Sequence, residues 1–322
     1  MALSDMKVFN EYLKRATIET LAQDVGKFNA ASAGAIQLTT QSIDGDFLQE
    51  SFWAGIHGAQ RRVDRYAANG AQSATPLSQK LYDSVKIAGG FGPILWEPGQ
   101  LSWVQKSPEE ALEVISRNLS EAIMSDQLNT ALAALVAAIG NQAGAVNDVS
   151  ATAGVNYSTI NGAHAKFGDA SARIVAQVMT GAMYHKLIGQ NLTNANHLFQ
   201  FQGVTVVDIL GKAVIVTDAP SLFTAGTPDK EKVLSLVSGA AVVSDGSDLI
   251  TNIQTTNGKN RIETTIQADY TFGLGLKGFT WDTANGGKSP TDVELATGSN
   301  WDLVANSIKA AAGVLTIGDA AK

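Results

Sequence analysis

The feature that most constrains this fold is a long helical pattern that begins at Pro108 and ends at Ile139. Ser107-Pro108-Glu109-Glu110 is a capping box with proline at the first helical position, and neither glycine nor proline follows until Gly140. At 1.5 Å per residue the predicted helix is about 48 Å long. Its apolar stripe consists of Leu112, Ile115, Leu119, Ile123, Leu128, Leu132, Leu135 and Ile139.

The two halves of this predicted helix differ in character. The first half carries the charged residues Glu110, Glu113, Arg117, Glu121 and Asp126, whereas residues 131–139 are apolar nearly all round. A helix that is apolar on every side is buried by other protein. We therefore expect one end of the helix on a surface and the other end enclosed.

The composition excludes several functional classes. Of the 322 residues only 16% are charged, against about 25% in an ordinary soluble domain, and residues 127–165 carry a single formal charge, Asp148. The absence of cysteine rules out disulfides, thiolate metal sites and a cysteine nucleophile. A net charge of -7 argues against a dedicated nucleic-acid binder. Without a signal-peptide pattern or a 20-residue apolar run, we expect a soluble protein made in a cytoplasm.

The first third of the chain reads as a helix followed by extended segments. A helix is predicted over 3–30 and a strand over 35–40. Residues 61–66 and 80–87 flank Asn69-Gly70 and predict a hairpin with a broad tip. Both arms are charged and have few large apolar residues. We therefore expect this hairpin to lack a core of its own and to lie on something else.

The rest of the chain mixes helices and strands, which predicts an α+β fold. Helical patterns cover 158–167 and 172–188, and a short helix is predicted near the C-terminus, beginning at 300. Strand patterns cover 203–208, 212–217, 232–237, 249–256 and 261–270. In the last of these, alternate residues from Ile262 to Phe272 share one face.

Motifs typical of cofactor or catalytic sites are incomplete. Residues 273–278 match G-x-G-x-x-G, but a strand pattern follows instead of the helix that a dinucleotide site needs. Residues 282–289 resemble a phosphate loop whose first glycine is replaced by Asp282. The four histidines show no metal-binding spacing, there is no G-x-S-x-G elbow, and His185 is expected to be half-buried. We predict no catalytic, cofactor-binding or metal-binding residues.

The densest basic cluster contains Arg61, Arg62 and Arg65 and surrounds Asp64. One interpretation is a solvated edge that keeps the hairpin from aggregating. The other is a contact with acidic residues of a neighbouring subunit. The candidate subunit-contact residues are Arg61, Arg62, Asp64, Arg65, Asn69, Gly70, Glu109, Glu110 and Glu113.

The order of these elements resembles a known family. After the arm, hairpin and long helix come Arg173-Ile-Val-Ala-Gln-Val-Met179, Met183-Tyr184 and Leu187, then Leu210-Gly211 and Val214-Ile-Val-Thr-Asp218. Gly278-Phe-Thr-Trp281 and Asn300-Trp301 follow near the end. From residue 1 to about 317 the chain is similar to the major capsid proteins of tailed bacteriophages, which have the Hong Kong 97-type fold.

The resemblance implies a domain organisation. It assigns an N-terminal arm to 1–34, an E-loop region to 35–105 and a P domain with a spine helix (108–139) to 106–170. It assigns an A domain with a mixed or antiparallel sheet to 171–285 and a C-terminal segment that returns to the P domain to 286–322.

The resemblance also implies a function and partners. Pentamers and hexamers of this chain would form an icosahedral head that encloses phage DNA, which is contacted without sequence specificity. A separate scaffolding protein, a portal and a decoration protein are the expected partners, with no membrane, and assembly would take place in the host cytoplasm. The alternatives are an encapsulin-like nanocompartment shell and an α+β enzyme with an unrecognised site.

Overall fold

The computed structural model describes residues 12–13, 15–17, 29, 32–42, 45–53, 59–77, 79–96, 108–193, 212–246, 248–258 and 260–322. The described residues of the predicted helix at 3–30 are helical, and the remainder of that helix lies outside the described residues. Ser107 of the predicted capping box and the predicted strand at 203–208 also lie outside them.

The described part of the chain is an α+β fold, as predicted. Its helices are α3 (Pro108–Gly140), α4 (Tyr157–Lys166), α5 (Gly181–Thr193) and the short α6 (Asp292–Leu295). Its strands are β1 (Ile36–Ser42), β2 (Phe47–Trp53), β3 (Gln79–Trp96), β4 (Val146–Asp148), β5 (Ile174–Met179), β6 (Ala213–Val216), β7 (Phe223–Thr224), β8 (Lys230–Val237), β9 (Ala241–Asp245), β10 (Ile250–Thr256), β11 (Glu263–Leu276), β12 (Phe279–Trp281), β13 (Trp301–Leu303) and β14 (Gly313–Asp319). The predicted long helix is confirmed as α3.

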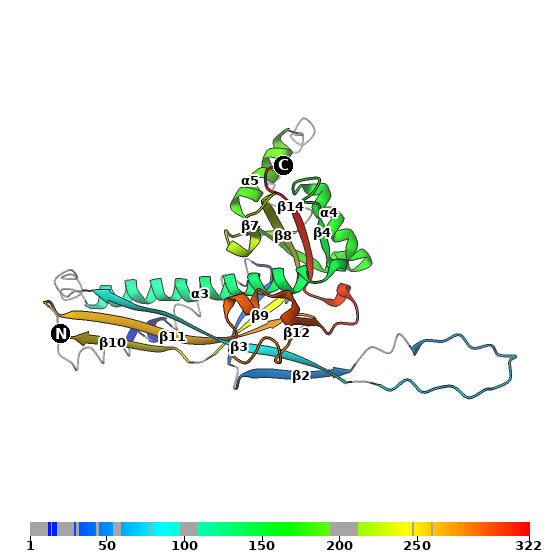
Figure 1. The fold of residues 1–322 in the computed structure, drawn as a ribbon, viewed down its shortest axis with the longest axis horizontal. Coiled ribbons are helices and arrows are strands. Elements are labelled where there is room, and N and C mark those ends of the chain that lie inside the picture. Colours follow the sequence, from blue (N-terminus) through cyan, green and yellow to red (C-terminus); the bar gives the residue numbers. More distant parts are fainter. Residues whose placement is uncertain are drawn as a thin grey trace.

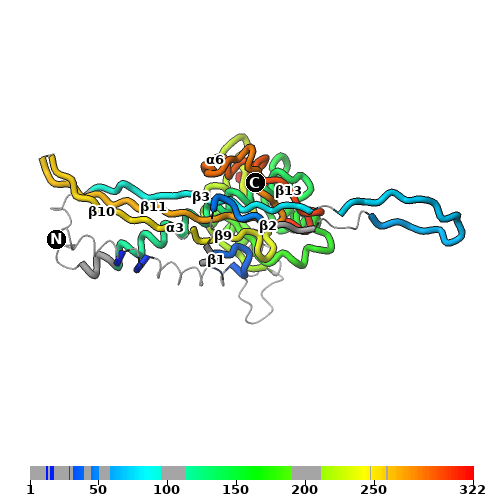
Figure 2. The backbone as a smooth tube through the Cα atoms, turned by 90° about the horizontal axis from the view of Figure 1, so that it is seen from below, coloured from blue at the N-terminus to red at the C-terminus, as the bar shows by residue number. Residues whose placement is uncertain are grey.

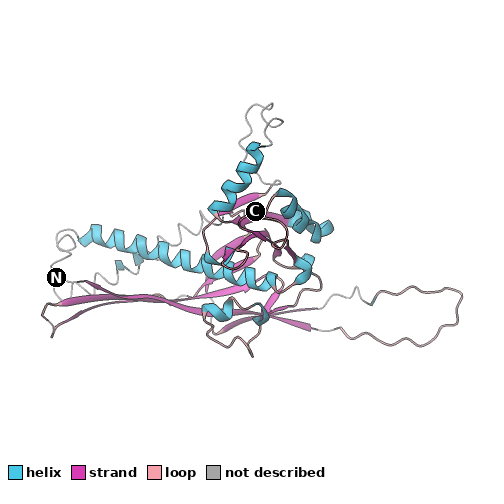
Figure 3. Ribbon diagram, turned by 45° about the horizontal axis from the view of Figure 1, so that its top comes forward, coloured by secondary structure: helices cyan, strands magenta, loops and turns pink. Residues whose placement is uncertain are grey.

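A long sheet lies beneath α3 (Figures 1 and 3). Its strand order is β1-β9-β11-β3-β2, and β10 pairs with the first half of β11. The predicted alternation along β11 is confirmed, because Thr264, Ala268, Tyr270 and Phe272 are buried, although Ile262 is exposed. Side chains on this face of β11 meet the apolar side of α3.

A second sheet stands at the C-terminal end of α3 and forms the compact upper body of Figure 1. Its strand order is β4-β14-β8-β5-β6, with β7 on one end of β8. One face packs into the core shared with α3, and the other is covered by α4 and α5. The chain's C-terminal strand β14 therefore lies inside this sheet, between strands that come much earlier in the sequence.

The predicted change of character along α3 is confirmed. In its inner half Leu132, Leu135 and Ile139 are fully buried, whereas Glu113 and Arg117 in its outer half are exposed. By length and composition α3 contains a segment, Glu113–Gly140, that could cross a membrane, but half of its most apolar window is buried against the rest of this chain.

Three local predictions were wrong. Residues 174–179 form strand β5 rather than part of a helix, because they pair with β8 on one side and β6 on the other. Residues 61–66 are not a strand: the strand that pairs with the first part of β3 across this loop is β2, at 47–53. The tail after residue 300 contains strands β13 and β14 and one short 3-10 turn, Ile308–Ala310, instead of the predicted short helix.

The topology also divides the expected A-domain range between the two sheets. Within 171–285, strands β5 to β8 belong to the upper sheet, whereas β9, β10 and β11 belong to the long sheet. The expected C-terminal range, 286–322, ends in β14 of the upper sheet. The exchange of strands between distant ranges ties the two sheets into one body.

Candidate assembly surface

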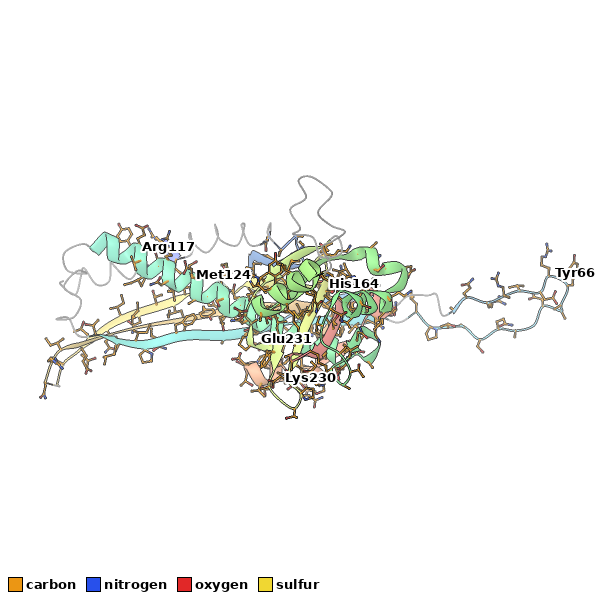
Figure 4. The ribbon with its side chains drawn as sticks, turned by 90° about the horizontal axis from the view of Figure 1, so that it is seen from above. Tyr66, Arg117, Met124, His164, Lys230 and Glu231 are labelled. Carbon is orange, nitrogen blue, oxygen red and sulfur yellow. The ribbon has the colours of Figure 1, made fainter. Side chains whose placement is uncertain are left out.

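The most exposed described segment of the molecule is the loop 59–77 between β2 and β3. Every residue in it is exposed. Figure 4 shows Tyr66 at its far end, well away from the body, and 92% of that residue's surface is exposed. A segment this extended gains almost nothing from burial within its own subunit.

The sequence explains why strand pairing stops before this loop. The pairing of β2 with β3 runs in unbroken register from Phe47 opposite Val85 to Trp53 opposite Gln79. In the loop, Val63, Tyr66 and Leu77 are the only large apolar residues that the structure describes, and more than half of each is exposed. Three separated apolar side chains cannot enclose a core. The predicted lack of a core in the hairpin is therefore confirmed for these residues.

The basic cluster lies on this loop near its tip. Asp64 accepts a hydrogen bond from the backbone N–H of Tyr66, at 2.9 Å, and the guanidinium of Arg65 lies 5.9 Å from the centre of the Tyr66 ring. Within the described residues, neither Arg61 nor Arg62 forms an ion pair. The cluster therefore presents a net positive charge to its surroundings.

The remaining predicted contact residues lie in two separate places. Asn69 and Gly70 are on the exposed loop, close to the arginines. Glu113 is exposed on the outer half of α3. Glu109 and Glu110 are helical residues in the first turn of α3, where the structure describes the backbone alone. The loop and the outer half of α3 are at opposite ends of the molecule (Figure 4), so one subunit does not bring them together.

The outer half of α3 is anchored to the long sheet by a contact that sequence patterns do not reveal. The Tyr270 hydroxyl donates a 2.5 Å hydrogen bond to the Asp126 carboxylate. Burial, that hydrogen bond and the negative charges of Asp126 and Asp292 raise the pKa of Tyr270 well above its ordinary value. The Tyr270 ring is stacked between Phe91 and Phe272, with ring centres 5.6 and 6.2 Å away. The hydroxyl is therefore neutral and serves as a fixed donor.

The glycine-rich motif lies in strand β11 and the turn after it, as the strand pattern predicted. Gly275 lies within β11, and a Cβ atom there would be 2.6 Å from both the Tyr82 hydroxyl and the Ser84 Oγ. Glycine at this position leaves room for the side chains of Tyr82 and Ser84 on the neighbouring strand β3. The phosphate-loop-like run is a surface turn, in which Asp282 accepts a hydrogen bond from the Ala284 N–H at 2.9 Å.

The structure describes two of the four histidines, His164 on α4 and His185 on α5. His185 is exposed rather than half-buried, because it points away from the sheet that α5 covers. The buried His164 contacts Ser235 through Nε2 and Oγ, at 3.0 Å. Among the described residues, no three His, Asp or Glu side chains are placed to hold a metal ion.

The described chain has an exposed loop without a core, a helix buried along only one half, and a long sheet. These features are typical of a subunit that packs against other subunits. The sequence matches the family model described as major capsid protein 13-like over residues 5–315. The chain belongs to the major capsid protein 13-like family. The subunit is thus a structural component of a phage head, and it assembles with its own copies into a capsid shell. No curated protein matches the sequence.

Solved structures agree with this family assignment at the level of the fold. A cyanophage Pam1 capsid chain is 13% identical, with a TM-score of 0.53, and the match covers 89% of this chain and 88% of that chain. A chain from Mycobacterium phage Bobi is 13% identical, with a TM-score of 0.50 and coverage of 90% and 89%. The capsid protein therefore has the Hong Kong 97-type fold. The family match favours the phage-head interpretation over the encapsulin-like shell and the enzyme.

Proposed function

We propose that this capsid protein forms pentamers and hexamers in which the loop 59–77 of each subunit lies on the next subunit. The observation that supports this most directly is the loop itself: all of its residues are exposed, and its apolar side chains have no core to enter. Head-to-tail contacts of this kind close into rings when the rotation between subunits is a fraction of a full turn. Rings of five and six subunits tile a closed icosahedral head.

The charges of the loop suggest what it meets. Arg61, Arg62 and Arg65 outnumber Asp64, and the exposed acidic residues of α3 include Glu113 and Glu121. We expect the arginine cluster to contact carboxylates of a neighbouring subunit, with Asn69 and Gly70 at the same contact. Glu109, Glu110 and Glu113 are proposed as contacts at the opposite end of the molecule.

The other expected partners belong to the same proposal. They are a separate scaffolding protein, a portal, a decoration protein and the enclosed DNA, with assembly in the host cytoplasm and no membrane. A net charge of -7 suits a wall that surrounds DNA without binding it tightly. The proposed role is structural and involves no catalytic turnover.

Deleting residues 69–78 tests the role of the loop. We expect a soluble, folded subunit that does not form shells, because the deletion removes contact surface and no core residue. Far-UV circular dichroism and thermal unfolding would check the fold, and negative-stain electron microscopy would count the shells. A variant in which the same residues are replaced by a glycine-serine segment of equal length separates loop length from loop sequence.

Normal shells from the deletion would contradict the proposal. The triple change Arg61→Gln, Arg62→Gln and Arg65→Gln then distinguishes the two interpretations of the basic cluster. Loss of shells would indicate a subunit contact, whereas normal shells from a less soluble subunit would indicate a solvated edge.

A further inference from the structure

A recess with a basic rim lies where the two sheets meet. Its volume is about 480 Å³. Its apolar lining comes from Val237, Ala310 and Ala311, of which Val237 and Ala311 are almost fully buried. Its cationic lining comes from Arg173, Lys277 and Lys309.

Positive charge is in excess around this recess. Lys309 forms an ion pair with Asp169, at 2.6 Å. Lys277 donates to the Ser238 carbonyl, at 2.9 Å, which leaves its charge uncompensated by that contact. Arg173 is exposed and makes no ion pair within the described residues. Three cations and one carboxylate suit a partner that brings two carboxylates and a small apolar group.

The short helix α6 presents such a group. Val293 is the most exposed large aliphatic residue of the described chain, at 76%, and it stands between Asp292 and Glu294. Leu295, two residues further along α6, anchors this segment to the body. The Leu295 side chain is buried, and the Leu295 carbonyl accepts a 3.0 Å hydrogen bond from the Trp301 indole N–H. The segment 292–294 is therefore a rigid acidic knob with an aliphatic centre.

The knob and the recess lie on opposite sides of the body. Figure 2 shows α6 on the upper side of the body and β1 on its lower side. The recess adjoins the β1 side, because the Lys277 N–H bonds to the Ala240 carbonyl and the Ala240 N–H bonds to the Ala35 carbonyl just before β1. The two surfaces cannot meet within one subunit. In a head-to-tail ring, opposite sides of neighbouring copies are the surfaces that do meet.

We propose that the knob 292–294 of one subunit inserts into the basic recess of the next copy in the ring. The proposal rests on the proposed assembly into pentamers and hexamers and adds a second contact to that of the loop. Val293 fills the apolar floor and the exposed Asp292 faces the three cations. The half-buried Glu294 carboxylate, which accepts hydrogen bonds from the Thr291 N–H and Oγ at 2.7 and 2.9 Å, adds its negative charge beside them. The contact fixes the angle between neighbouring bodies. Complementary charges at such a contact also suppress wrong pairings.

Because the chain has no cysteine, an engineered pair reports this contact without background. The double variant Val293→Cys/Ala310→Cys places one thiol on the knob and one at the recess. In assembled particles, mild oxidation should link each subunit to the next and produce a ladder of up to six chains on a non-reducing gel. Either single variant should give at least about tenfold less cross-linked product, because a disulfide needs its two Cα atoms within about 7 Å.

Shells that form normally from the double variant but yield no ladder would overturn this inference and leave the proposed assembly intact. Absence of shells from the unmodified chain would instead overturn the proposed assembly. These two failures are therefore distinguishable.

Charge reversal provides a test that does not depend on cysteine. Asp292→Lys should lower the yield of shells about tenfold, as should Arg173→Asp, and the combined variant should restore it. Asp292→Lys combined with Arg117→Asp has the same net charge but reverses the wrong cation, so it should not restore assembly. Full assembly of both single variants would refute the contact.

Discussion

The inner half of α3 and the loop 59–77 place their apolar side chains in opposite environments. Leu132 and Leu135 are fully buried in a core shared by both sheets, whereas Val63 and Tyr66 are among the most exposed large apolar residues that the structure describes. Both segments come from the same chain, but folding buries the apolar side chains of only one of them, the inner half of α3. The comparison teaches that the residues that complete the fold are not the residues of the proposed assembly contact.

This division explains the low charge of the chain. A subunit whose surface is largely covered by copies of itself needs fewer charges for solubility than a free protein does. The charged residues of the loop and of the outer half of α3 lie where neighbours are expected, and the nearly uncharged run at 127–165 includes the buried half of α3.

The largest effect is expected from a charge inside the body. Leu132→Asp or Leu135→Asp should abolish folding, because an unpaired carboxylate in the core costs several kcal/mol, comparable with the stability of a whole domain. Soluble expression and circular dichroism would measure this.

A matched control lies on the same helix. Val114 is 44% exposed on the outer half of α3, so Val114→Asp should change the free energy of unfolding by less than about 0.5 kcal/mol. A folded, soluble Leu132→Asp subunit that fails only in assembly would show that the inner half of α3 is an interface.

An intermediate effect is expected where α3 is anchored to the long sheet. Tyr270→Phe removes the donor to Asp126 and leaves that half-buried carboxylate without the bond, which should cost about 1–3 kcal/mol. Urea unfolding would measure the loss. Tyr66→Phe removes an exposed hydroxyl and serves as the control, with no measurable change expected. Equal stability of the two variants would mean that the anchor contributes nothing.

A pH effect is expected from the buried His164 in the upper body. Burial lowers the pKa of His164, and the positive charge of Lys212 lowers it further. As the pH falls below about 6.5, the unfolded chain binds the proton more readily than the folded one, so stability falls with acidification and is regained above that pH. Urea unfolding at pH 7 and pH 5 should show the loss, and His164→Gln should reduce it. An unaltered pH dependence in His164→Gln would contradict this account.

The smallest effect on stability is expected at the tip of the loop. Tyr66→Ala should change the free energy of unfolding by less than about 0.5 kcal/mol, because the side chain contacts almost nothing in its own subunit. The same variant should reduce shell formation, which would sharpen the separation between folding and assembly. Destabilisation as large as that of Tyr270→Phe would show that the loop folds onto its own body.

Local patterns were sufficient to predict α3 and β11. The first is fixed by an uninterrupted 3.6-residue period and the second by strict alternation, and both periods are properties of neighbouring residues. Residues 174–179 were mispredicted because a short apolar run suits a helix or a strand equally well. Their state is decided by pairing with β6 and β8, which lie far along the sequence.

The candidate surface divides in the same way. The composition of the hairpin predicted that the loop would lack a core, because that conclusion needs only a count of apolar residues. The prominence of Tyr66, the Tyr270 anchor and the knob on α6 depend on where the fold places single side chains. No spacing in the sequence carries that information.

The most direct test of the central claim is the rate of trypsin cleavage at Arg61, Arg62 and Arg65 in free subunits and in assembled shells. An exposed loop in the free subunit should be cut rapidly, and the variant with all three arginines changed to glutamine should identify these sites. If neighbouring subunits cover the loop, cleavage in shells should slow by at least about a hundredfold. That factor corresponds to a contact free energy of ~2.8 kcal/mol, because each 1.4 kcal/mol changes an equilibrium tenfold. Equal cleavage rates in free subunits and shells would contradict the account.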